Sequence, residues 1–470
     1  MRENRLLAQL REGGRLTFPD QLRLIVQLSV PAIMAQLSSV VMQYIDASMV
    51  GALGKQAAAS VGLMASSTWF LNNMCLATAT GFYVQVAQYI GAGKEMEARR
   101  VTGQGLACGI GISLALALTG VLLSPHLPRL YGGNADITGG ASAYFRIYAM
   151  AVPLILLNNL AGGALQSSGN MVIPSILHVV MCVLDVIFNF FFIFPARTVS
   201  LAGSAVTLPG AGLGVAGAAI GTALAIACSA TAMLYFLLVR SPALHIRSGE
   251  ALTFRREELT RAVRIGLPVA VERGVINGAQ IAGTRIIAPL GTVAIAANSF
   301  AITAEGICYL PGYGVAAAAI TLIGQSVGAK RRDMEKKLGW MLTFFGMAVM
   351  GAGAALVYVF APQMISLLTR EEEVHALAVD LLRIVAFVEP MFGASIVIAG
   401  IFRGAGRTVV SSLINLFSMW LIRLPLMLLM AGKWGLKGAW YAMVIELTIR
   451  GILFLAWLYG NGRKAEAEAI

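Results

Sequence analysis

Residues 172–195, VIPSILHVVMCVLDVIFNFFFIFP, form a nearly continuous apolar run that contains one carboxylate, Asp185. A helix needs about 20 predominantly apolar residues to cross a bilayer, so this run predicts a membrane span. Eleven further runs of the same kind, bounded by charged or turn residues, lie on either side of it. The twelve predicted spans cover residues 24–50, 57–90, 101–123, 141–165, 172–195, 213–238, 265–289, 294–325, 338–361, 376–402, 408–431 and 439–459.

The composition of the whole chain leads to the same class of protein. Of its 470 residues, 58% are hydrophobic and 12% are charged, and the mean hydropathy is +0.77. Soluble domains average about 45–50% apolar and about 25% charged residues. We therefore expect an all-α integral membrane protein. Twelve spans leave no room for a separate soluble domain, and no G-x-x-x-x-G-K-[ST] loop of an ATPase occurs.

The positive charge, +12 in net, lies between the apolar runs and not in one stripe, which argues against a nucleic-acid partner. The N-terminus, the even-numbered loops and the C-terminus carry 23 of the 35 Lys and Arg residues, and the odd-numbered loops carry six. Cytoplasmic segments are the ones enriched in Lys and Arg. We expect a multi-pass protein of a prokaryotic inner membrane with both termini in the cytoplasm. The first 20 residues lack the apolar region of a cleavable signal peptide.

The chain repeats itself at an offset of 237 residues. The repeat predicts two pseudo-symmetric six-helix lobes, residues 1–238 and 265–470, joined by a cytoplasmic loop at 239–264. Six is an even number, so the two lobes have the same orientation, which is typical of transporters with a cleft between parallel repeats. The loop at 196–212 has no counterpart of equal length in the second half. The matching landmarks are Pro31 with Pro268, Leu53-Gly54 with Leu290-Gly291, Gln88 with Gln325, Gly91-Ala92 with Gly328-Ala329, Pro125 with Pro362, Arg146 with Arg383, Pro153 with Pro390, and Gly169 with Gly406.

Four local motifs stand in a fixed order along the chain. They are Pro31 followed by Asp46-Ala-Ser-Met-Val-Gly-Ala-Leu-Gly54, then Pro311-Gly-Tyr-Gly, Thr321-Leu-Ile-Gly-Gln-Ser-Val-Gly-Ala329 and Arg403-Gly-Ala-Gly-Arg-Thr408. Together with the repeat, these motifs resemble those of the multidrug and toxic compound extrusion (MATE) family over nearly the whole chain. The resemblance implies twelve helices in two lobes, alternating access, and export driven by an inward proton or sodium gradient.

Charged side chains inside the first lobe are few, and each costs at least ~2.5–3.5 kcal/mol at mid-membrane. Asp46 lies in the first span, and Asp185 and Asn189 lie one turn apart on one face of the fifth. The family resemblance implies a cation site here, with the Asn and Asp of the fifth span exchanged and Thr222 of the sixth span as a further ligand. Facing carboxylates favour proton uptake, and the oxygen ligands also suit Na⁺.

Glu272 and Glu305 of the second lobe lie on adjacent spans and are candidates to face the cleft. There they would attract an organic cation, with Tyr309 adding a cation–π contact. Alternatively they neutralise Arg273 and Arg285, and Arg285 is itself a candidate substrate contact. Glu446 and Arg450, four residues apart, predict an ion pair.

We therefore expect a secondary active multidrug efflux antiporter that exports organic, cationic amphipathic compounds in exchange for H⁺ or Na⁺. The four histidines are scattered, and no H-E-x-x-H or G-x-S-x-G motif occurs, so we expect no enzymatic activity and no cofactor. A monomer in the lipid bilayer is the expected form. The alternative is a lipid-linked oligosaccharide flippase of the same superfamily, which would use cavity cations such as Arg273, Arg285 and Arg423.

Overall fold

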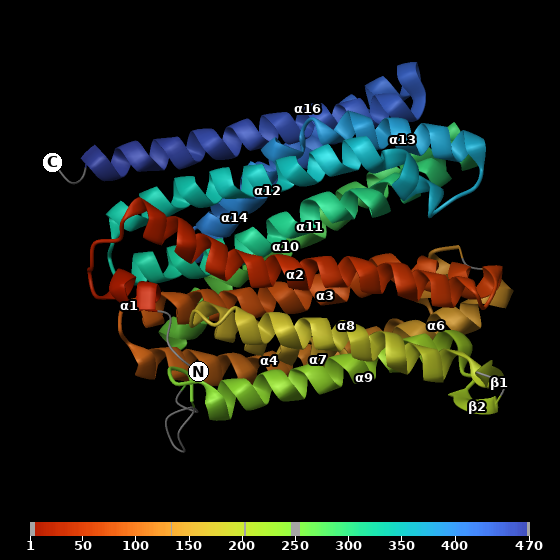
Figure 1. Cartoon of the computed structure of the whole chain (residues 1–470), viewed down its shortest axis with the longest axis horizontal. Helices are drawn as coiled ribbons and strands as arrows, with labels where there is room; N and C mark the ends of the chain where they lie inside the picture. Colours follow the sequence, from red (N-terminus) through yellow and green to blue (C-terminus); the bar gives the residue numbers. More distant parts are fainter. Residues whose placement is uncertain (1–4, 133, 202–203, 246–253, 468–470) are drawn as a thin grey trace.

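The computed structural model describes residues 5–132, 134–201, 204–245 and 254–467, and almost all of them are helical. Long helices run side by side along one axis (Figure 1). The short helix α1 (Arg5–Arg11) and the visible chain ends lie at one end, and a β-hairpin lies at the other. These are called here the α1 end and the hairpin end.

The first half of the chain forms one lobe. Its elements are α2 (Phe18–Gly51), α3 (Lys55–Gly91), α4 (Glu95–Leu123), α5 (Leu127–Leu130), α6 (Ala135–Met150), α7 (Val152–Ser167), α8 (Val172–Ile193), the strands β1 (Pro195–Leu201) and β2 (Ser204–Ala211), α9 (Gly214–Tyr235) and η1 (Phe236–Arg240). The two strands pair antiparallel as a hairpin, and they cover most of the loop expected at 196–212.

The second half repeats the helices without a described hairpin. Its elements are α10 (Arg256–Ile287), η2 (Ala288–Leu290), α11 (Thr292–Gly328), α12 (Arg332–Ser366), α13 (Glu372–Ala386), α14 (Glu389–Gly404), α15 (Thr408–Phe417), η3 (Ser418–Arg423) and α16 (Leu424–Ala467). Because α10 begins at Arg256, the end of the expected loop at 239–264 is helical; residues 246–253 lie outside the described residues.

Apart from one or two terminal residues, each predicted span lies on one helix or on two or three consecutive helices, which confirms the all-α, twelve-helix, two-lobe fold. Among the described residues, seven helices are long and apolar enough to cross a membrane, or up to nine with bent pairs joined. The helices α3 and α10 do not pass that test alone; they pack against each other between the lobes, where polar side chains do not meet lipid. Gly435, at φ 60°, separates the last two spans within α16.

Two bends between consecutive helices occupy equivalent places in the repeat. The α6–α7 pair bends by 44° and the α13–α14 pair by 60°. Pro153 and Pro390 begin the second helix of each pair, and a proline has no N–H to continue the preceding helix. Pro311, by contrast, lies inside α11, which continues as one helix through it.

The repeat is also visible in the backbone dihedrals. Gly54 and Gly291 have φ of 104° and 99° where each half turns from its first span to its second. Gly93 has φ 70°, and its counterpart Lys330 has φ 57°; Lys330 is the one non-glycine with positive φ among the described residues. A side chain with a Cβ is strained in this region. Lys330 follows the end of α11 at the position where glycine usually ends a helix.

Lys330→Gly is expected to raise the free energy of unfolding by about 0.5–1 kcal/mol, because glycine removes the strain of the left-handed conformation. An apparent melting temperature in detergent measures it. Lys337→Gly, at an exposed position inside α12, is the matched control and should lower stability by about 1 kcal/mol. Equal losses from both substitutions would contradict the assignment of strain to Lys330.

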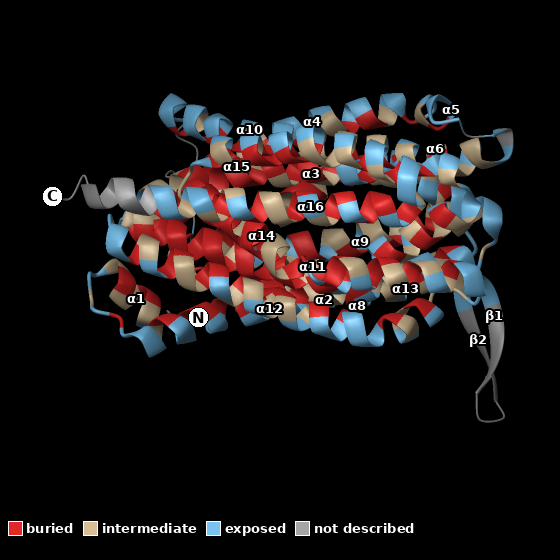
Figure 2. Ribbon diagram, turned by 90° about the horizontal axis from the view of Figure 1, so that it is seen from above, coloured by how far each residue is buried: buried red, intermediate tan, exposed pale blue. Residues whose placement is uncertain are grey.

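The lobes meet where α10 and α11 pack against α2 and α3, a surface called here the seam. Buried residues lie along the middle of the bundle, and exposed residues lie mainly on its outside and at its ends (Figure 2). Many exposed side chains are large and apolar, such as Leu118, Leu356 and Leu421. A surface of this kind faces lipid in a multi-pass membrane protein. Leu7 and Leu10 of α1 belong to the same buried cluster as Leu322 of α11.

Candidate functional site

The first lobe brings together the side chains that the sequence placed in one cation site. Asp46 comes from α2, Asp185 and Asn189 from α8, and Thr222 from α9. The Asn189 amide Nδ2 donates to Asp46 Oδ1 at 3.0 Å and to Asp185 Oδ2 at 3.1 Å. Asp185 also interacts with the Asp46 carboxyl and the Thr222 hydroxyl. One amide therefore holds two carboxylates together.

The carboxylate cluster, formed by Asp46, Asp185, Asn189 and Thr222, is buried at its α8 residues and partly buried at Asp46 and Thr222, and it is short of hydrogen-bond donors. Asp185 and Asn189 are each 1% exposed. Asp185 Oδ1 and Asn189 Oδ1 have no hydrogen-bond partner among the described residues. Unpaired buried oxygens beside two acids fit a shared proton or a small hard cation. No group of three or more His, Cys, Asp or Glu side chains that could hold a metal occurs in the described part of the chain, so a Na⁺ ligand set would need the amide and the hydroxyl.

Two glycines of α9 let the cluster form. A Cβ on Gly221 would overlap Asn189 Oδ1 and lie 2.9 Å from the Asn189 backbone nitrogen. A Cβ on Gly217, one turn earlier, would lie 2.9 Å from the backbone nitrogen of Ile193. Small residues at this spacing allow two membrane helices to approach closely. The close contact of α8 with α9 brings Thr222 beside Asp185.

Sequence reasoning missed Tyr144, which neighbours the cluster, and a second polar contact between α8 and α2. His178 of α8 is 2.7 Å from Ser39 of α2, measured from Nε2 to Oγ. Tyr144 of α6 lies within electrostatic reach of both aspartates of the cluster. A signal for His178 was present, since it lies seven residues before Asp185 and shares its helix face. Ser39 and Tyr144 had no such signal, because only the packing of helices brings them close.

Glu272 of the second lobe is held in a polar network. Arg403 Nη2 donates to Glu272 Oε1 at 3.0 Å, and Asn415 Nδ2 donates to the same oxygen at 2.8 Å. Ser412 Oγ donates to Oε2 at 3.0 Å. The side chains of Glu272 and Arg403 are 2% and 10% exposed. Glu272 therefore neutralises Arg403, and not Arg273 or Arg285 as one sequence interpretation had it.

The network continues into the last span. Arg450 Nη1 donates to Asn415 Oδ1 at 3.4 Å, and its Nε lies 3.1 Å from Glu446 Oε1. The predicted ion pair between Glu446 and Arg450 is thus confirmed. Arg423 Nη1 lies 4.0 Å from Glu446 Oε2. Glu446 is fully buried, so the two arginines offset the cost of its charge.

Glu305 has a different partner from the one that the sequence suggested. It interacts with Glu389 of α14 and with Arg423. Glu389 is 1% exposed, and neither of its carboxylate oxygens has a hydrogen-bond partner among the described residues. The ring of Tyr309 lies 6.0 Å from that of Phe392 beside this pair. Arg285 is exposed on α10 and has no hydrogen bond or ion pair within the described chain.

Glu272→Ala is expected to lower stability by about 3–5 kcal/mol, because the buried guanidinium of Arg403 loses its counter-charge. The apparent melting temperature measures this loss. The double change Glu272→Ala/Arg403→Ala should recover part of it, since neither charge then stays unpaired. Unchanged stability together with weaker dye binding would instead favour the predicted substrate role of Glu272.

Two glutamines join the lobes at the α1 end of the seam. Gln88 Nε2, on α3, donates to the Gly404 carbonyl at 2.9 Å. Gln325 Nε2, on α11, donates to the Ser167 carbonyl at 2.8 Å. The two donors are 237 residues apart in the sequence, and so are the two acceptors. The repeat therefore makes the same hydrogen bond twice. We call these two side chains the glutamine pair.

The surroundings of the glutamine pair hold this end closed. A Cβ on Gly91 would overlap the Gln325 carbonyl, and one on Gly328 would overlap the Gln88 carbonyl. Arg261 donates to Gln88 Oε1. Arg11 of α1 donates to Gln325 Oε1 at 3.1 Å. Each glutamine therefore donates across the seam and accepts from an arginine.

Comparison with known proteins gives the family. The MatE family model matches residues 31–191 and 268–429, two copies that begin at positions 237 apart. Probable multidrug resistance proteins NorM of Pseudomonas aeruginosa and Thermotoga maritima are similar to the chain, at 28% identity (94% of this chain, 90% of the relative) and 22% identity (95% and 94%).

Solved structures show the same fold. A MATE crystal structure in complex with MaL6 matches with a TM-score of 0.89 at 20% identity, covering 99% of this chain and 100% of that one. A MOP superfamily transporter from Pyrococcus furiosus, described as having a binding pocket of reverse polarity, matches with a TM-score of 0.88 at 20% identity over 98% and 99%. With both halves matched by the family model, the chain belongs to the MATE family of membrane transporters.

Proposed function

We propose that the protein is a secondary active multidrug efflux antiporter that exports organic, cationic amphipathic compounds in exchange for H⁺ or Na⁺. The contact of Asp46 with the buried Asn189 and Asp185 carries this proposal, because it combines two acids with unpaired oxygens inside a membrane-spanning lobe. The names of the NorM relatives support drugs as the exported class. The protein is not an enzyme, and it works as a monomer without a cofactor.

The proposed orientation places the α1 end in the cytoplasm of an inner membrane. The excess of Lys and Arg in the loops at that end supports it. Both termini are then cytoplasmic, and the carboxylate cluster lies nearer the outer side. The closed glutamine pair then blocks passage to the cytoplasm.

The helix α2 links the cluster to the seam, since it carries Asp46 and packs against α11. A proton or Na⁺ that enters from outside removes the repulsion between Asp46 and Asp185. It also changes how the Asn189 amide divides its hydrogen bonds between the two carboxyl groups. This change repacks α2 and releases the substrate outward. Return of the cation to the cytoplasm requires the glutamine pair to open. The coupling cation and the exported compound favour different conformations of the protein. They therefore compete for the protein without sharing a binding site.

Dye transport in inverted vesicles tests the coupling, with a pH gradient and a sodium gradient imposed separately. Dye accumulation driven by the pH gradient alone assigns a proton to the carboxylate cluster. Accumulation driven only by sodium makes the cluster a Na⁺ site. No dye movement under either gradient would overturn the antiport proposal.

The flippase alternative needs unpaired cations in the cavity to meet a pyrophosphate. Arg423 is paired with Glu446, which weakens that alternative. Arg273 supports it, because its Nε has no hydrogen-bond partner among the described residues and its guanidinium lies 5.9 Å from the ring centre of Tyr313. Loss of lipid-linked oligosaccharide translocation in an Arg273→Gln variant, with dye transport absent, would favour the flippase.

A further inference from the structure

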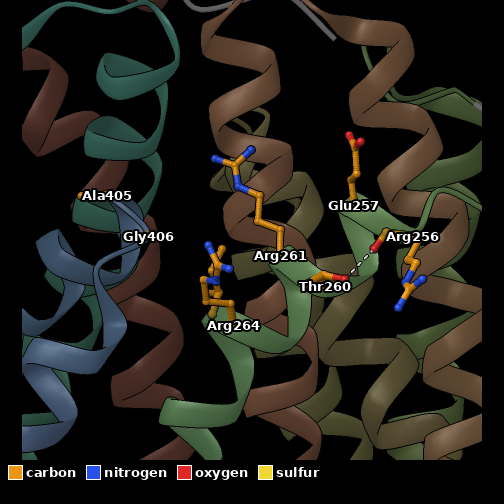
Figure 3. Close-up of a pocket in the computed structure, with 8 residues that line it drawn as sticks. Arg256, Glu257, Thr260, Arg261, Arg264, Ala405 and Gly406 are labelled. Atoms are coloured by element: carbon orange, nitrogen blue, oxygen red, sulfur yellow. Dashed lines mark hydrogen bonds between the residues drawn. The ribbon is translucent and has the colours of Figure 1, made fainter.

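A cavity of about 720 Å³ lies at the α1 end, between the start of α10 and the turn from α14 to α15 (Figure 3). Its wall on α10 consists of residues spaced three and four apart, which share one helix face. The lining side chains are Arg256, Glu257, Thr260, Arg261, Arg264 and Ile265, with Ala405 and Gly406 opposite.

The charge of this cavity is unbalanced. Three arginines and one glutamate line the cavity, and none of Arg256, Arg261 and Arg264 forms an ion pair within the described chain. Arg256 and Arg264 are exposed. Like charges on one helix face repel each other. An anion in the cavity would remove that repulsion, and the guanidinium geometry suits phosphate oxygens in particular.

The surface next to the cavity is apolar. Val263, Leu267 and Val271 follow one another at intervals of four along α10 and are 59%, 58% and 54% exposed. This stripe runs from the arginines toward the middle of the bilayer. A ligand with a charged phosphate head and hydrocarbon tails fits both features together, whereas a free phosphate uses only the first.

We propose that this cavity binds the phosphate headgroup of an anionic phospholipid from the leaflet at the α1 end, with the acyl chains along the α10 stripe. Arg256 and Arg264 bind the phosphate, and Arg261 lies between the headgroup and Gln88. The lipid and Gln88 therefore compete for one guanidinium, which connects the occupancy of the cavity to the glutamine pair. The leaflet assignment rests on the proposed orientation, but binding itself does not depend on transport.

Lipid binding is measured on the purified full-length protein by thermal-shift titration with short-chain phosphatidylglycerol. Phosphatidylcholine with the same acyl chains and inorganic phosphate are the comparison probes. Phosphatidylglycerol should stabilise the wild type more than either probe. In the Arg256→Gln/Arg264→Gln variant its apparent affinity should fall roughly thirtyfold, from the loss of two arginines near an anionic headgroup.

The matched control is Arg15→Gln/Arg23→Gln, which removes the same charge from exposed positions at the α1 end outside the cavity. It should keep the affinity of the wild type. Arg264→Lys keeps the charge but loses the planar fork, so it should bind more weakly than the wild type and more tightly than the double variant.

Three results would overturn the proposal. An equal loss in the control variant would mean general attraction to a basic surface. Equal stabilisation by inorganic phosphate would exclude the lipid as the source of the phosphate. Equal stabilisation by phosphatidylcholine would exclude recognition of the headgroup charge. Melting without added lipid shows that each variant is folded, and dye transport plays no part in these readings.

Discussion

Asp185→Asn is expected to reduce gradient-driven dye transport at least tenfold while leaving the protein folded. The substitution keeps the shape of the side chain and removes its charge, so the cluster can no longer alternate between a repelling and a neutralised pair of acids. Asp185 is 1% exposed and shares the Asn189 amide with Asp46, so Asp185→Asn leaves Asp46 as a single acid at this amide. Transport is measured in inverted vesicles with equal amounts of folded protein.

Asp380→Asn is the matched control for this change. Asp380 lies on α13 and is about half exposed, and its partner Lys437 is 2.7 Å away. An exposed ion pair contributes little to stability, so this variant should transport like the wild type. Normal gradient-driven transport by Asp185→Asn would exclude the carboxylate cluster as the coupling site.

Gly91→Ala/Gly328→Ala is expected to open the α1 end and to stop transport. Each new methyl group would overlap a backbone carbonyl of the facing lobe, and a backbone cannot swing away as a side chain does. Overpacking costs about 1–3 kcal/mol a site, so the two sites together shift the population away from the closed form by at least about thirtyfold. Spin labels at Lys94 and Lys337, one on each lobe, measure the opening as a longer distance.

Gly62→Ala is the control, because its Cβ would meet open space on the same helix α3. It should leave both the label distance and transport unchanged. An unaltered distance in the double glycine variant would mean that the closed form tolerates the methyl groups and that the seam is looser than the carbonyl contacts indicate.

Much of the fold could be predicted from the sequence, because a membrane requires long apolar helices and a charge inside it is energetically costly. The same cost identified Asp46 and Asp185, and the family resemblance added Asn189 and Thr222. The hairpin at 195–211 could not be predicted in this way, since its alternating short strands lie outside the membrane-spanning runs.

The partners across the seam, and those of Glu272 and Glu305 in the second lobe, were beyond sequence reasoning. Glu272 and Glu305 lie on neighbouring spans, yet their partners differ. Through the packing of α14, Glu272 binds Arg403, whereas Glu305 lies beside Glu389. Gln88 and Gln325 were visible as landmarks of the repeat. Their hydrogen bonds were not, because each acceptor is a backbone carbonyl of the other lobe, and a carbonyl leaves no signature in the sequence.

The two equivalent hydrogen bonds of the glutamine pair make the seam resemble a homodimer interface. Gln88 uses the Gly404 carbonyl as Gln325 uses that of Ser167, so each half contributes one donor and one acceptor. Such self-complementarity is the property of a two-fold symmetric contact. A six-helix chain of half this length could therefore close against its own copy with the same two bonds, and gene duplication would then have joined an interface that was already complete.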